Sequence, residues 1–190
     1  MMIARALIAT SFMGAALMAC SAQSTSSSHP AKLQLASHKA AAKASIINRQ
    51  GDSVGSALLY QGSSGVIMRL SIHGLTPGIH GMHFHAKGTC EDPNEGFKAT
   101  GGHVMPFGKP HGYMNQDGPH AGNLPNLIIG ENGMASVEIY TGLVTLFEGP
   151  AALLDEDGST LIIHENEDDH ITQPIGGAGG RIACGVIEKS

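Results

Sequence analysis

The sequence predicts an all-β domain, built as a β-sandwich or a flattened barrel and carrying two long loops. Glycine supplies 26 of the 190 residues while only 4% of residues are aromatic, a composition typical of many short strands joined by turns. Short runs of alternating apolar and polar residues recur along the chain. No segment shows helical periodicity over a useful length, so strands are the main elements expected.

The predicted strands begin at Ser45 and follow one another to the C-terminus. Gly51-Asp52 separates two short runs and predicts a hairpin. Residues 66–73 alternate well, with apolar side chains at 66, 68, 70 and 72 on one face and His73 on the other. Further strands are predicted at 82–86, 126–129, 135–140, 151–154, 160–164 and 181–187.

Two long segments interrupt this series of strands. Residues 88–125 contain many glycines and prolines, and residues 165–180 are acidic at first and then rich in glycine. Loops of this length are uncommon inside a compact domain unless they are functional or are held by other interactions. We therefore expect both loops to contribute to function, held in place by a disulfide and a metal site.

The N-terminal residues predict a targeting segment. Residues 6–18 are almost wholly apolar, about the length of a signal-peptide core and too short to span a bilayer. The sequence Leu-Met-Ala-Cys at 17–20 resembles a bacterial lipobox, in which Cys20 would carry the lipid; an ordinary signal peptide with a chance cysteine is the alternative. The expected organisation is a signal peptide at 1–19, a lipidated Cys20 with a flexible tether to residue 44, and a domain at 45–190.

Cysteine number and net charge restrict the compartment and the partners. The chain has three cysteines, and if Cys20 takes a lipid, Cys90 and Cys184 are left to pair in an oxidising compartment. The net charge of -5, with no basic block, argues against nucleic acid as a partner. The predicted location is the periplasm, with membrane contact only through the lipid anchor, and Ser21 favours the outer membrane.

Histidine is the residue type that indicates a function. Nine of the 11 histidines lie between His73 and His170. His83 and His85 lie two residues apart in a predicted strand, so both side chains share one face, about 7 Å apart along the chain, and can reach one ion. His164 ends an apolar strand, where it is either a hydrogen-bonded core residue or a ligand.

Three more histidines lie in the first long loop. The spacings between His103, His111 and His120 are eight and nine residues, which suit ligands presented separately by a loop. Imidazole binds zinc, copper, iron and nickel, and an all-imidazole site is compatible with copper in both oxidation states. A surface role is the alternative for any single histidine, but six of them near strand and loop ends favour a metal site. His73, on the outer face of its strand, is expected to bind no metal.

Five motifs carry a family resemblance. They are GIHGMHFHAKGTC at 78–90, GGHVMPFGKPHG at 101–112, GPHAGNLPNL at 118–127, LIIHENEDD at 161–169 and GGAGGRIACGVI at 176–187. In this order they resemble the copper/zinc superoxide dismutases in their bacterial exported form. The resemblance implies a Greek-key fold of eight strands, one copper and one zinc per subunit, and a monomer or homodimer. The implied reaction converts two superoxide anions and two protons to dioxygen and hydrogen peroxide, protecting the cell envelope.

The resemblance also implies a role for each site residue. Copper would be bound by His83, His85, His103 and His164, and zinc by His103, His111 and His120. His103 would bridge the two ions and pass protons, and Arg181 would lie beside copper as the second catalytic residue. Asp168 would link a copper histidine to a zinc histidine. His80 would brace the loop, and Cys90 and Cys184 match the disulfide of the family.

One position departs from the pattern of the family. Three residues after the last zinc histidine the family has an aspartate as fourth zinc ligand, and this chain has Asn123. An amide oxygen is neutral and a weaker donor than the carboxylate oxygens that bind zinc, so zinc is expected to bind less tightly. A copper-binding or copper-delivery lipoprotein with the same fold is the alternative function. Such a protein would be expected to lack the four-histidine copper set or the arginine.

Overall fold

Alternating burial defines the first strands of the computed structural model, which describes residues 39–190. The strands β1 (Ala42–Asn48), β2 (Ser53–Gln61) and β3 (Val66–Ile72) pair antiparallel in sequence order. In β3 the four apolar residues predicted to share a face are all buried, and His73 just beyond it is exposed. The predicted signal peptide and Cys20 lie outside the described residues, as does the tether up to residue 38.

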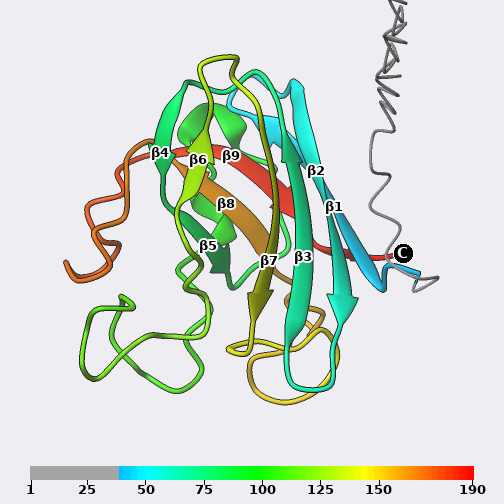
Figure 1. Ribbon diagram of the computed structural model, residues 1–190. Coiled ribbons are helices and arrows are strands. Elements are labelled where there is room, and N and C mark those ends of the chain that lie inside the picture. The colour runs from blue at the N-terminus through cyan, green and yellow to red at the C-terminus, as the bar shows by residue number, and fades with distance from the viewer. Residues whose placement is uncertain (1–38) are drawn as a thin grey trace, which may run out of the picture. The chain divides into compact units, whose positions relative to one another are not determined.

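The remaining elements complete one curled sheet and one small ribbon (Figure 1). They are β4 (Gly78–His80), β5 (Met82–His85), η1 (Pro93–Glu95), η2 (Lys98–Thr100), β6 (Leu127–Ile129), β7 (Ala135–Thr141), β8 (Thr160–His164), β9 (Arg181–Val186) and β10 (Glu188–Lys189). The sheet order is β5-β8-β9-β1-β2-β3-β7, with β10 also paired to β1, while β4 pairs with β6. Since β9 returns late in the chain to lie beside β1, the connection is of the Greek-key kind. The predicted all-β class is confirmed.

The concave side of the sheet encloses the hydrophobic core. Fully buried side chains from β1, β2, β3, β5 and β8 meet there, among them Ile46, Leu59, Met68, Phe84 and Ile163. Burying each side chain of this size stabilises the fold by about 1.5–3 kcal/mol. This core packs against β5, β8 and β9, which lie beside one another in the sheet and carry His83, His85, His164 and Arg181 of the candidate site.

The long loops agree with the sequence, whereas one predicted strand does not. Residues 86–126 connect β5 to β6 and residues 165–180 connect β8 to β9. The strand predicted at 151–154 is wrong, because these residues form turns whose one bridge joins Thr145 to Ala152. Ala152 and Leu153 are buried. This apolar run is therefore buried without forming a strand.

The first strand begins three residues earlier than the domain start predicted at Ser45. Ala42 and Ala44 are buried and Lys43 between them is exposed. These alanines continue an Ala-rich segment, so in the sequence the start of the strand looks like part of the predicted tether. Within residues 39–190, no helix has the length and apolar character needed to cross a membrane.

A disulfide ties the first long loop to the sheet. Cys90 and Cys184 are bonded, with Cα atoms 6.0 Å apart and a sequence separation of 94. Cys184 lies in β9 and is fully buried with Phe97 and Ile162. The predicted pairing is confirmed, and it anchors the loop segment that contains η1 and η2.

Candidate metal centre

Four buried histidines converge beside the sheet. His83 and His85 come from β5, His164 ends β8, and His103 comes from the first long loop. His103 reaches the strand through an isolated β-bridge to His85. One side-chain nitrogen from each of the four lies within 4.8 Å of the others, so the structure brings together the four residues predicted to bind copper.

Hydrogen bonds fix how three of these rings face. Each ring has one nitrogen held by an oxygen that can only accept, so this nitrogen carries the proton and the opposite one keeps its lone pair. The pairs are His83 Nε2 with Asp168 Oδ2 at 2.7 Å, His85 Nδ1 with the Gly101 carbonyl at 2.9 Å, and His164 Nδ1 with the Gly179 carbonyl at 3.2 Å.

In these three rings the other nitrogen is buried and has no hydrogen-bond partner, and the same is true of one nitrogen of His103. The atoms are His83 Nδ1, His85 Nε2, His164 Nε2 and His103 Nε2. A buried polar atom without a partner is costly and is uncommon in native proteins. Four such nitrogens within 4.8 Å of one another fit a metal ion that accepts imidazole ligands, such as copper.

A second cluster shares His103 with the first. His103 Nδ1 lies 2.8 Å from His120 Nε2, and the same His120 atom lies 3.4 Å from His111 Nδ1. All three rings are buried. The single ring of His103 therefore presents Nε2 to the four-histidine cluster and Nδ1 to the three-histidine cluster, the arrangement expected of a bridging imidazole.

Asp168 joins the two clusters from the second long loop. Its Oδ2 accepts from His83 Nε2, while its Oδ1 accepts from His111 Nε2 at 2.9 Å and from the backbone N–H of His170 at 2.7 Å. Burial raises the pKa of Asp168, but the hydrogen bonds from His111 and His83 outweigh burial and hold that pKa well below its ordinary value. A carboxylate between two rings orients both of them.

Asn123 lies beside the three-histidine cluster. Its side chain is fully buried, and its amide nitrogen is 3.2 Å from His111 Nδ1. The position predicted as a weak zinc ligand is therefore adjacent to the other candidate ligands, but it turns a nitrogen toward them.

Two amides that the sequence did not suggest hold the long loops together. Asn126 donates to the Asp168 carbonyl at 2.8 Å and accepts from the Asp168 N–H at 3.0 Å. Gln173 pairs in the same way with the backbone of His111, accepting at 2.9 Å and donating at 2.8 Å. Their partners lie 42 and 62 residues away in sequence, so no local pattern indicates these contacts.

His80 lies apart from both clusters. Its Nδ1 is 2.8 Å from the His164 carbonyl, and its Nε2 is 2.9 Å from the Thr76 carbonyl. Both contacts are to backbone oxygens, so His80 connects the turn before β4 to the end of β8 and has no ring nitrogen free for a metal.

Burial controls the charge of the clustered rings. It is the main cause that lowers the pKa of His164 to about 3 and of His120 to about 4, with repulsion from His83 and from His111 as the next largest contributions. Burial also lowers the pKa of His83, His85 and His103. These five rings are therefore neutral at neutral pH, which is the state in which imidazole binds metals.

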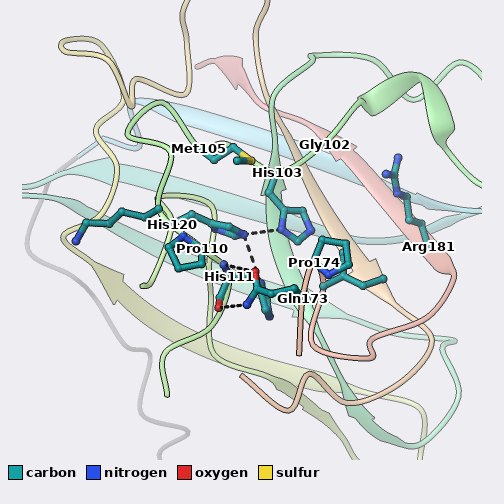
Figure 2. A pocket seen from close by; sticks show the side chains of 11 residues that line it. Gly102, His103, Met105, Pro110, His111, His120, Gln173, Pro174 and Arg181 are labelled. Carbon is teal, nitrogen blue, oxygen red and sulfur yellow. Dashed lines mark hydrogen bonds between the residues drawn. The ribbon is translucent and has the colours of Figure 1, made fainter. Parts of the chain in front are cut away.

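A pocket of about 310 Å³ opens beside the clusters (Figure 2). Figure 2 shows Arg181 on one side of His103 and His111 and His120 on the other. Lys109 also lines this pocket, so it contains two cationic side chains. Because the whole chain carries a net charge of -5, attraction of an anion has to come from local charges such as these.

Arg181 is fixed in place by the first long loop. Its Nη1 donates to the Phe97 carbonyl at 2.7 Å and to Thr100 Oγ1 at 2.8 Å, and its Nη2 donates to the Gly101 carbonyl at 2.8 Å. Gly101 also accepts from His85. The guanidinium group is therefore positioned by the same backbone that orients one of the clustered histidines.

Residues 23–187 match the family model of copper/zinc superoxide dismutase. The chain belongs to the copper/zinc superoxide dismutase family. It is 47% identical over 141 residues to a copper-zinc superoxide dismutase of Caulobacter vibrioides, covering 73% of this chain and 80% of the relative. A copper-zinc superoxide dismutase of Aquifex aeolicus is 42% identical over 148 residues, covering 77% and 85%. A solved SOD-like protein from Bacillus subtilis is 38% identical, with a TM-score of 0.72 over 76% of this chain and 96% of that one.

Membership in this family makes the protein an oxidoreductase that acts on superoxide. Copper and zinc are its cofactors, and the two buried histidine clusters fit them. The sharing of His103 between the clusters suits a family that uses two neighbouring ions.

Proposed function

We propose that the four-histidine cluster binds the copper of this superoxide dismutase and that the three-histidine cluster binds its zinc. The copper ligands would be His83, His85, His103 and His164, and the zinc ligands would be His103, His111 and His120. The observation that carries this proposal is the set of four buried ring nitrogens that face one another without a hydrogen-bond partner. When bound, copper supplies a one-electron redox couple and zinc a positive charge of constant oxidation state.

The residues around the clusters have separate roles in the proposed reaction, which turns two superoxide anions and two protons into dioxygen and hydrogen peroxide. Arg181 attracts the anion and orients it beside His103, because both residues line the same pocket. His103 Nε2 takes up a proton in one half of the cycle and gives it to reduced oxygen in the other. Asp168 keeps the rings of His83 and His111 oriented throughout.

The place of action in this proposal is outside the cytoplasm. The Cys90–Cys184 disulfide supports this, because such bonds persist in oxidising compartments. In this proposal the apolar N-terminal segment directs export, and a lipid on Cys20 attaches the enzyme to the outer membrane. The enzyme then acts in the periplasm. There it removes superoxide that would damage the cell envelope.

Decay of superoxide in the presence of copper-loaded protein tests this function. We expect fast decay for the wild type and for His73→Ala, whose side chain is exposed, and slow decay for His164→Ala. A copper-delivery protein would instead transfer its copper readily to a competing chelator and would speed the decay little. Wild-type protein with one copper per chain that removes superoxide no faster than the metal-free protein would contradict the proposal.

A further inference from the structure

Asn123 is held rigidly against the three-histidine cluster. Its backbone N–H donates to the His120 carbonyl at 3.2 Å, its carbonyl accepts from the Tyr113 hydroxyl at 2.9 Å, and the residue forms a β-bridge with His83. The side chain is fully buried. Its amide group therefore has few orientations available to it.

The backbone of Gly112 determines which end of the amide faces the cluster. The Gly112 N–H lies 3.2 Å from Asn123 Oδ1, and a donor requires an acceptor opposite it. The other end of the amide is then the NH₂ group, which lies 3.2 Å from His111 Nδ1. Turning the amide over would set two donors against each other at Gly112 and leave a buried N–H without an acceptor.

Gly112 cannot readily move away from this contact. Its φ of 106° is in the region that favours glycine, and a Cβ at this position would lie 2.0 Å from the His170 carbonyl oxygen. The backbone of Gly112 is thus packed closely against the second long loop. The direction of its N–H, and with it the orientation of Asn123, is set by this packing.

This geometry separates asparagine from aspartate at position 123. A carboxylate could accept from Gly112 with one oxygen and offer the other to a metal ion, whereas the amide has only hydrogen atoms to offer there. We propose that Asn123 is a hydrogen-bond donor to His111 and not a metal ligand, so that the cluster binds zinc weakly and accepts copper(II) in place of zinc. This inference rests on the proposed assignment of the cluster as the zinc site.

The chemistry of the remaining ligands favours this exchange. Structural zinc is nearly always held by four ligands in a tetrahedron. This cluster supplies three imidazoles, and for His111 the metal must compete with Asn123 for the Nδ1 lone pair. Nitrogen sites bind copper(II) more tightly than zinc unless geometry selects against it. The carboxylate of Asp168 contacts His111 at Nε2, on the opposite side of the ring from Nδ1, so it gives the cluster no anionic ligand.

Metal retention by the full-length protein tests the inference. Protein loaded with one copper and one zinc is dialysed against a chelator, and both metals are counted per chain. We expect the wild type to lose its zinc and Asn123→Asp to retain about one zinc per chain, with a zinc dissociation constant roughly 10- to 100-fold lower. Asn132→Asp adds the same charge in the exposed turn after β6 and should behave as the wild type. Wild-type protein given excess copper(II) should bind a second copper, seen in its electron paramagnetic resonance spectrum.

Asn123→Ala gives an independent answer if a buried carboxylate prevents Asn123→Asp from folding. Because no ligand is removed and His111 Nδ1 no longer accepts from Asn123, this variant should bind zinc at least as tightly as the wild type. A tenfold or greater loss of zinc affinity in Asn123→Ala would make Asn123 a ligand and overturn the inference. So would wild-type protein that retains zinc as tightly as Asn123→Asp. Absence of zinc binding in every variant would overturn the zinc assignment itself, and the inference with it.

Discussion

Replacing Asp168 by asparagine should weaken one of the two metal sites. The carboxylate accepts from one ring of each cluster, His83 at 2.7 Å and His111 at 2.9 Å. An asparagine can accept from one ring only and turns its NH₂ toward the other. That ring must then move its proton to the nitrogen that faces the metal, or leave an N–H unpaired. In either case one ligand of a cluster is impaired.

The size of the effect follows from the one hydrogen bond that is lost. Loss of a hydrogen-bond partner behind a metal ligand typically costs 10- to 100-fold in metal affinity, which corresponds to about 1.4–2.7 kcal/mol. We expect a loss in this range for one of the two metals in Asp168→Asn and little change for the metal whose histidine keeps the amide oxygen. Competition against a coloured chelator, one metal at a time, measures both affinities.

The neighbouring residue provides a matched control. Asp169 is exposed, and its carboxylate bonds only to Thr172 and to the backbone N–H of Ile171. Asp169→Asn therefore removes the same charge one residue away and should leave both affinities unchanged. If Asp168→Asn binds copper and zinc as tightly as Asp169→Asn, the carboxylate does not orient the rings and the reasoning fails.

Three further predictions follow from the structure. Arg181→Ala should lower kcat/KM for superoxide by about tenfold or more and flatten its dependence on ionic strength. Stopped-flow rates at several salt concentrations measure this dependence. If kcat/KM of the variant depends on salt as steeply as that of the wild type, Arg181 does not attract the anion. Cys90→Ser should lower the free energy of unfolding by up to about 4–5 kcal/mol for a 94-residue separation, as measured by urea titration; a loss below about 1 kcal/mol would mean that other contacts hold the loop. The metal-free protein should lose stability as the pH falls from about 6.5 toward 4, because unfolded histidines take up protons there while His120 and His164 stay neutral until about 4 and about 3. Urea midpoints across this range should therefore rise with pH, and a flat profile would count against burial of neutral rings.

The two-residue period of a β-strand was enough to predict from the sequence that two of the clustered histidines lie together. His83 and His85 are two residues apart in a strand, so one rule about side-chain direction places them on one face, and both belong to the four-histidine cluster. His164 was ambiguous from the sequence, because burial at a strand end suits a core residue as well as a ligand. Only its position in β8, next to β5 in the sheet, brings it to the other two.

The contacts that hold the two long loops together cannot be predicted from the sequence. Asn126 and Gln173 act on backbone groups far away in the chain, and polar residues in loops have no periodicity that marks a partner. The orientation of Asn123 likewise depends on the backbone of Gly112. The error at 151–154 has the opposite origin, since apolar residues there are buried by a loop and the pattern alone does not separate such a loop from a strand.

The position of copper in the loaded protein tests the central claim most directly. Anomalous diffraction at the copper edge, from crystals of protein given one equivalent of copper, locates the ion without any assumption about its ligands. The ion should lie within bonding distance of His83 Nδ1, His85 Nε2, His103 Nε2 and His164 Nε2, which are buried without hydrogen-bond partners in the four-histidine cluster. Copper bound elsewhere on the chain, with these nitrogens left uncoordinated, would contradict the account.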